Sequence, residues 1–241
     1  MNVIEEKFIE QQHELQKKIN LKNEVDISKV KTIAGVDLAY WNEGDEEYAV
    51  CCIIVIDYAT KEVIEKVYHK DIVKVPYISG CLAFREIPLF QEAYKKLQND
   101  PDVFFFDGNG YLHPRHMGLA THAGILIDKP SIGIAKRYCM VQNVEFVMPD
   151  KEENSYTDIE IDGEVYGRVL RTHEGIKPIF LSVGNKIDLE TATIMTKELV
   201  SKESHVPLPT RLADLMTHEV RRQYQENRKI GIFEECGNAY T

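Results

Sequence analysis

Apolar and polar positions in the first part of the chain predict one helix followed by three strands. Residues 2–20 place apolar side chains among charges as an amphipathic helix does, and residues 21–30 are polar enough for a connection. Apolar or alternating runs predict strands over residues 31–41, 49–57 and 62–68. Because their connections are short, we expect these strands to form an antiparallel meander.

The middle of the chain predicts a strand, a loop, a helix and a second strand. The apolar run 103–106 stops at Asp107, residues 117–127 have near-helical apolar spacing, and the run 132–135 ends at Lys136. Such a unit nearly always forms a right-handed crossover between parallel strands. Asp107 and Lys136 would then lie at the carboxyl edge of one sheet, where open α/β sheets bind ligands. The alternative is structural, with Asp107 capping a loop and Lys136 solvated.

Beyond Lys136 the pattern is weaker and acidic side chains become frequent. Residues 141–165 carry so many carboxylates that we predict a surface excursion, and residues 231–241 are polar enough for a loose tail. Thr210 is the predicted N-cap of the last helix. The other predicted elements are a helix starting around residue 86, strands over residues 166–171 and 179–182, and helices over residues 188–201 and 211–227.

Length and composition set the class of protein. The 241 residues, 44% of them hydrophobic, suit a single domain over residues 1–241. No apolar run is long enough to cross a membrane, and the first residues lack a signal-peptide pattern, so we expect no membrane contact. The five cysteines form no CxxC pair, which predicts reduced thiols in the cytoplasm and neither a disulfide framework nor a zinc site.

The formal net charge of −10 argues against a protein that holds nucleic acid by bulk charge. It leaves open an enzyme that meets phosphates locally, through metal ions and a few cations.

Isolated carboxylates provide the candidate chemistry. Asp37 lies among apolar residues of a predicted strand, where an unpaired carboxylate is costly to bury, unless it faces solvent on the other side of the sheet. Glu86 lies near a helix start, which the helix dipole alone would favour. The order of elements matches the ribonuclease H-like α/β fold, a mixed central sheet flanked by helices. In that sheet Asp37 and Asp107 can meet, and Glu86 and Asp214 could complete the cluster.

Converging carboxylates repel one another, and a hard divalent cation with oxygen ligands, usually Mg²⁺, resolves the repulsion. Lys136 could bind the scissile phosphate or position the attacking water. The chemistry that fits these groups is phosphodiester hydrolysis.

Several blocks between Ala34 and Asp214, in one order, resemble the endonuclease V family. The resemblance implies a Mg²⁺-dependent enzyme, with Mn²⁺ expected to substitute. It implies a cut 3′ to inosine (deaminated adenine), one nucleotide beyond the lesion, in DNA and possibly RNA, as a step of DNA repair. The blocks are AGVDLAYW, PYISGCLAFREIP, DGNGYLHPRHMGLATHAGI, IGIAK, GRVLRT, KPIFLSVGNKIDLETA and LPTRLAD.

The resemblance also implies roles for single residues. It implies metal ligands at Asp37, Asp107 and Glu86, with Asp214 completing the acidic site and Lys136 as the active-site lysine. It implies a wedge aromatic at Tyr77 and a base pocket at Gly80, Leu82, Gly108 and His113. Ile78 beside Tyr77 could help to fill the gap in the base stack, and Arg115, a cation within a matched block, is a candidate phosphate contact.

The chain departs from the family at Ser79, where proline is usual, and at Cys81, where the family has a bulkier residue. Val183 and Asn185 stand where proline and histidine are common.

Three functions fit these features: an inosine-directed endonuclease, a related nuclease with another target, and a non-catalytic inosine-binding module. The acidic residues and Lys136 favour a nuclease, and Tyr77 favours the inosine-directed one, although alone it could be an ordinary loop aromatic. His113 could likewise be a turn residue. We expect a monomer.

Overall fold

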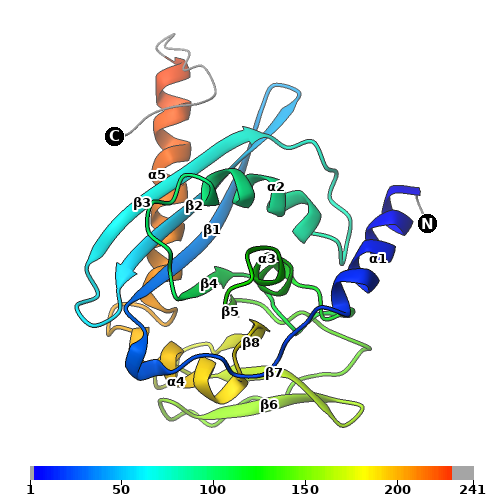
Figure 1. The fold of residues 1–241 in the computed structure, drawn as a ribbon, viewed down its shortest axis with the longest axis vertical. Coiled ribbons are helices and arrows are strands. Elements are labelled where there is room, and N and C mark those ends of the chain that lie inside the picture. Colours follow the sequence, from blue (N-terminus) through cyan, green and yellow to red (C-terminus); the bar gives the residue numbers. More distant parts are fainter. Residues whose placement is uncertain (1–2, 230–241) are drawn as a thin grey trace.

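The computed structural model describes residues 3–229, whose strands form an eight-stranded sheet with helices packed against it (Figure 1). The strand order is β3-β2-β1-β4-β5-β8-β7-β6. The strands are β1 Thr32–Glu43, β2 Glu46–Asp57, β3 Val63–Ile72, β4 Val103–Asp107, β5 Ser131–Ala135, β6 Tyr156–Ile161, β7 Glu164–Leu170 and β8 Ile179–Asn185. The helices are α1 Val3–Gln16, α2 Ala83–Tyr94, α3 Leu119–Ile127, α4 Leu189–Leu199 and α5 Leu208–Lys229, with a short 3₁₀ turn at Ile27–Lys29.

Strand β1 lies at the junction between the antiparallel and parallel parts of the sheet. It pairs antiparallel with β2, which pairs antiparallel with β3, so the predicted meander is confirmed. On its other side β1 pairs parallel with β4, and β4 pairs parallel with β5. Strand β8 then adds antiparallel to β5. The predicted ribonuclease H-like fold, with its mixed sheet, is therefore confirmed.

Both faces of the central strands are buried, and alternate residues enter two cores. Ile33 and Phe105 pack with residues of α4 and α5 on one face. Ala34 and Phe106 pack with residues of α2 and α3 on the other. Because residues 33–37 of β1 and 103–106 of β4 are buried, these segments read as nearly continuous apolar runs. The segment of β1 that leads to Asp37 and the segment of β4 that leads to Asp107 are consequently fixed by packing from both sides.

Several predicted boundaries and one predicted region differ from the structure. The acidic stretch 141–165 is not only a surface excursion, because it contains edge strand β6, with Ile159 and Ile161 buried. Acidic residues alternate with these isoleucines, so composition hid a strand pattern. Thr210 is not an N-cap, because α5 begins at Leu208. Thr210 therefore lies in the first turn of the helix, and its hydroxyl donates to the carbonyl of Pro207, the residue before the helix.

Two other sequence predictions concern the ends of the chain and membranes. Helix α1 ends at Gln16, which is earlier than predicted, and the predicted tail 231–241 lies outside the described residues. Within 3–229, no helix combines the length and apolar character needed to cross a membrane.

Gly35 allows the start of α5 to lie directly on β1. A Cβ atom built at Gly35 would lie 2.0 Å from the carbonyl oxygen of Pro209, so any larger residue would displace the helix. Because Asp214 is on α5 and Asp37 is on β1, this contact also sets the distance between two acidic side chains.

We expect Gly35→Ala to lower the free energy of unfolding by at least about 3 kcal/mol, the upper end of ordinary overpacking, because the obstacle is backbone. Chemical denaturation measures the loss. Gly44→Ala is the control: Gly44 has a φ of +59° but open space around it, so only left-handed strain of roughly 1–2 kcal/mol applies. Equal losses in the two variants would contradict the close-contact argument.

Candidate active site

Three carboxylates meet where the carboxyl end of β4 lies beside the middle of β1. Val36 of β1 pairs with Phe106 of β4, so Asp37 and Asp107 follow at the same level of adjacent strands. Asp214 approaches from α5, near its N-terminal end. One carboxylate oxygen from each of the three lies within 4.8 Å of the others. The strand register and the α5 contact with β1 therefore produce the cluster that the sequence predicted for these three residues.

Lys136 contributes a positive charge to this cluster from the residue after β5. Its Nζ lies 2.6 Å from Oδ2 of Asp107 and 3.5 Å from Oδ1 of Asp214. The hydroxyl of Thr217, one turn of α5 beyond Asp214, donates to Oδ2 of Asp37 over 3.5 Å. One lysine thus faces three carboxylates, and the cluster retains an excess of negative potential.

Burial and repulsion together change the protonation of the cluster. Burial, followed by the charges of Asp107 and Asp214, raises the pKa of Asp37 to about 8. Burial also raises the pKa of Asp107, although the hydrogen bond from Lys136 opposes it. Carboxylates that are this reluctant to ionise need a further cation near neutral pH. A set of three clustered carboxylate oxygens matches the ligand preference of a hard divalent ion.

Glu86 lies apart from the three clustered aspartates. It is in the first turn of α2, is 8% exposed, and accepts a hydrogen bond of 3.2 Å from the Tyr40 hydroxyl. Burial raises its pKa to about 8, and the charge of Asp107 adds to the effect. The charges of Glu86 and Asp107 therefore interact, but Asp214, not Glu86, is the third member of the cluster. A ligand role for Glu86 stays a prediction.

The predicted wedge lies on the loop between β3 and α2. Tyr77 is 69% exposed and Leu82 is 41% exposed. Gly80 has a φ of +73°, a left-handed conformation that suits glycine. Its carbonyl accepts hydrogen bonds from Gln12 and Arg115. Arg115, predicted as a phosphate contact, therefore already has protein partners.

His113 is buried and neutral in the following loop. Its Nδ1 accepts from the backbone N–H groups of Arg115 at 3.2 Å and Met117 at 3.3 Å. Burial, with a further contribution from the Arg115 charge, lowers the pKa of His113 to about 4. Because Nδ1 accepts, the proton of the neutral ring lies on Nε2. His113 thus orders its own loop, and its predicted contact with a base stays a prediction.

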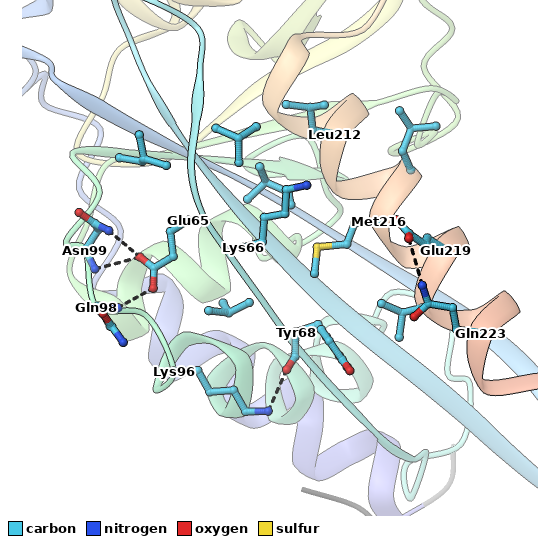
Figure 2. Close-up of a pocket in the computed structure, with 16 residues that line it drawn as sticks. Glu65, Lys66, Tyr68, Lys96, Gln98, Asn99, Leu212, Met216, Glu219 and Gln223 are labelled. Carbon is cyan, nitrogen blue, oxygen red and sulfur yellow. Dashed lines mark hydrogen bonds between the residues drawn. The ribbon is translucent and has the colours of Figure 1, made fainter. Parts of the chain in front are cut away.

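A groove of about 1360 Å³ lies elsewhere, between β3, the turn at residues 96–99 and α5. Its lining includes none of the predicted site residues. Figure 2 shows that its polar groups bind one another: Glu65 accepts from Gln98 and Asn99, and Lys96 donates to the Tyr68 carbonyl. These contacts attach the turn to the edge strand, so the acidic cluster is the better candidate for chemistry.

Sequence reasoning missed Thr217, which donates to Asp37, and also Tyr40 and Gln12. Tyr40 lies three positions after Asp37, inside the block AGVDLAYW, and it contacts Glu86. Gln12 lies four positions after Phe8, so helical spacing places it on the apolar face of α1. A polar residue on that face was the available signal.

Comparisons with known proteins place the chain in a family. The endonuclease V family model matches residues 13–215. Endonuclease V of Bacillus subtilis (strain 168) is 56% identical over 223 residues, which are 92% of this chain and 94% of that protein. The crystal structure of Bacillus subtilis endonuclease V matches with a TM-score of 0.91 and 56% identity, covering 94% of this chain and 95% of that chain.

A more distant solved structure carries nucleic acid. Endonuclease V of Ciona intestinalis, in complex with a 24mer DNA containing an inosine followed by a ribo-adenosine, matches with a TM-score of 0.79. It is 28% identical and covers 92% of this chain and 99% of that chain. With these matches over nearly its whole length, the chain belongs to the endonuclease V family of metal-dependent endonucleases.

Proposed function

We propose that this protein hydrolyses the phosphodiester bond one nucleotide 3′ to inosine in DNA, with RNA as a second substrate, and that it uses Mg²⁺ in DNA repair. The observation that carries the proposal is the cluster of Asp37, Asp107 and Asp214 with Lys136 at the sheet edge. The Ciona intestinalis relative solved with inosine-containing DNA supports the substrate.

The acidic residues and Lys136 divide the chemical work. Asp37 and Asp107, with Asp214 or Glu86, would hold the divalent ion, which when bound would activate water and stabilise charge on the leaving oxygen. Mn²⁺ would bind the same oxygen ligands. Lys136 is 44% exposed in its side chain, so its ammonium can reach a phosphate oxygen while it stays next to Asp107. Its charge would orient the scissile phosphate over the acidic cluster.

Recognition would require the base to leave the helix stack. Inosine pairs poorly with thymine, so turning it out costs less than for a matched base. Tyr77 and Ile78 would fill the gap in the stack. The backbone near Gly80 and Gly108, with Leu82 and His113 beside it, would form the pocket for the turned-out base, because glycine permits close approach.

The protein is proposed to act as a monomer in the cytoplasm. Cys51, Cys52, Cys81 and Cys139 are free thiols, which suits a reducing compartment.

We expect a single Mg²⁺-dependent cut on the 3′ side of inosine, one nucleotide beyond it, in matched oligonucleotides, and no cut in adenine controls. Asp107→Asn should lower the rate by at least on the order of 10²- to 10³-fold, because a metal site supplies several kcal/mol and 1.36 kcal/mol is a factor of ten. Strand cleavage on denaturing gels, in Mg²⁺ and in chelator, measures both effects. DNA and RNA strands of the same sequence give the substrate preference.

Asp45→Asn is the matched control, since Asp45 is exposed in the β1–β2 turn. Binding of Asp107→Asn to the inosine strand should survive. Cleavage that ignores inosine would reject the recognition part of the proposal, and metal-independent cleavage would reject the catalytic part.

Metal affinity should increase as pH rises to about 8. Asp37 keeps its proton up to a pKa of about 8, and a metal ion must displace that proton. Each displaced proton makes the apparent affinity up to about tenfold tighter per pH unit below this value. Calorimetric titration with Mg²⁺ between about pH 6 and about pH 9 tests this, because affinity should level off above the pKa. A pH-independent affinity below about pH 8 would contradict it.

Without metal, folding stability should change with pH in the direction opposite to that of metal affinity. The folded carboxyl of Asp37 stays protonated between about pH 4 and about pH 8 while the unfolded one ionises, so stability should fall as pH rises through that window. Denaturation in chelator measures the same titration independently.

Tyr77→Ala should reduce cleavage of duplex substrates by roughly 10- to 100-fold, since unstacking a base step costs a few kcal/mol that the wedge would offset. Single strands need no wedge and should be affected much less. The comparison is kcat/KM on single- and double-stranded inosine DNA of the same sequence. Tyr156→Ala, which removes another exposed aromatic on edge strand β6, is the control. Equal loss on both substrates would reject the wedge role.

A further inference from the structure

We infer that Gln12 is a positioning residue for the base pocket, acting through a buried hydrogen-bonded node of Gln12, Gly80 and Arg115. The inference rests on the proposed function, because it assigns to helix α1 a part in selecting inosine. The sequence alone predicted only an amphipathic helix here, with no part in the site. The node lies outside the acidic cluster and shares no residue with it.

The node is a closed triangle of hydrogen bonds. Gln12 is 0% exposed, and its Nε2 donates to the Gly80 carbonyl at 2.9 Å. Its Oε1 accepts from Nε of Arg115. The Nη2 of Arg115 donates to the same Gly80 carbonyl at 2.7 Å. Both ends of the amide are therefore used, and a buried amide with no water access would be costly to leave unpaired.

The node fixes the peptide that joins the wedge to the pocket. A carbonyl oxygen has two lone pairs, and the Gly80 carbonyl accepts from Gln12 and from Arg115. The N–H of Cys81 donates to the Ile78 carbonyl at 2.9 Å, which closes the turn on the wedge side. With carbonyl and following amide both held, Gly80 keeps its left-handed conformation of φ +73°. The orientation of Gly80 toward a base is thereby set by Gln12 and Arg115.

Arg115 extends the node to the second pocket loop. Its backbone N–H donates to Nδ1 of His113, while its guanidinium binds Gly80 and Gln12. The two chain segments predicted to enclose the base, around Gly80 and around His113, are thus joined through one arginine. Gln12 holds that arginine by a bond to Nε, which restricts its rotation.

Helix α1 is attached to this part of the fold by a ring contact beside Gln12. Figure 1 shows α1 at the side of the molecule, apart from β1 and β4. Phe8, one turn before Gln12, stacks on Phe84 with ring centroids 4.2 Å apart. Phe84 lies in the first turn of α2, two residues before Glu86. The Phe8 contact therefore attaches the helix, and Gln12 is the polar group that it delivers to the pocket loop.

Two substitutions separate positioning from simple packing. Gln12→Glu keeps an acceptor for Arg115 and removes the donor to Gly80, whereas Gln12→Met keeps the volume and removes both bonds. Exposed Gln11 is the matched control, as Gln11→Met.

The first measurement is steady-state cleavage by the full chain in Mg²⁺, on strands that differ only in having inosine, guanine or adenine at one position. The second measurement is thermal unfolding of each variant. Gln12→Met should lower kcat/KM on inosine by roughly 10- to 100-fold, mainly through KM, and narrow the ratio of inosine to guanine cleavage. Gln12→Glu should show a smaller change in the same direction. The rate at saturating substrate and the metal requirement should remain those of the wild type.

Three results would overturn the inference. The first is that both Gln12 variants have the same KM, and the same ratio of inosine to guanine cleavage, as Gln11→Met. The second is a uniform loss of activity on every strand that follows the loss of thermal stability. The third is failure of both variants to fold, since Gln12 would then be structural. If the wild type does not cut inosine strands, the proposed function has failed, which is distinguishable from all three.

Discussion

Repulsion among Asp37, Asp107 and Asp214 is the constraint on which the rest of the structure depends. Holding three carboxylates within 4.8 Å, partly shielded from water, is unfavourable, and Lys136 offsets only part of the charge. The central strands can hold them because the residues of β1 and β4 that precede Asp37 and Asp107 are buried in apolar cores on both faces. The side chains cannot separate without breaking the strand register or lifting α5 from β1. The repulsion is therefore not relieved by movement, and it raises the pKa values of Asp37 and Asp107 and favours binding of a cation.

Local pattern was sufficient to predict only part of this site. Asp107 and Lys136 follow apolar runs on either side of a helix, so the crossover rule alone predicts that they lie at one sheet edge, and the parallel pairing of β4 with β5 confirms it. Asp214 is different, because its position depends on α5 resting against Gly35, a contact between residues far apart in sequence. No period or spacing encodes such a contact. The fold class followed from element order, but β6 was overlooked because its acidic residues dominate the composition of the segment.

Gln12 illustrates a second limit of sequence reasoning. Helical spacing shows that its side chain faces inward, yet it cannot show what the side chain meets. Its partners come from residues 80 and 115, which only tertiary structure brings to α1. The same limit applies to the prediction that Arg115 contacts a phosphate. The sequence identifies a cation beside the proposed pocket, but it does not show whether a protein group already binds that cation. Polar residues on apolar helix faces are therefore more informative than exposed charges.

The separation between chemistry and recognition explains why the departures at Ser79 and Cys81 leave the acidic set unaffected. The carboxylates are fixed by the sheet and α5, whereas the proposed wedge and pocket are on loops. Proline at position 79 would restrict the wedge through its ring, and serine gives up that restraint. The turn from Cys81 to Ile78 and the two bonds on the Gly80 carbonyl restrain the same segment from its other side. Cys81 also fits this arrangement, because its sulfur lies 3.7 Å from Nη2 of Arg115, where a bulkier side chain would push against the guanidinium. The segment that contains the proposed wedge thus has contacts from α1 and from the loop that contains His113, next to the position where the usual proline is replaced.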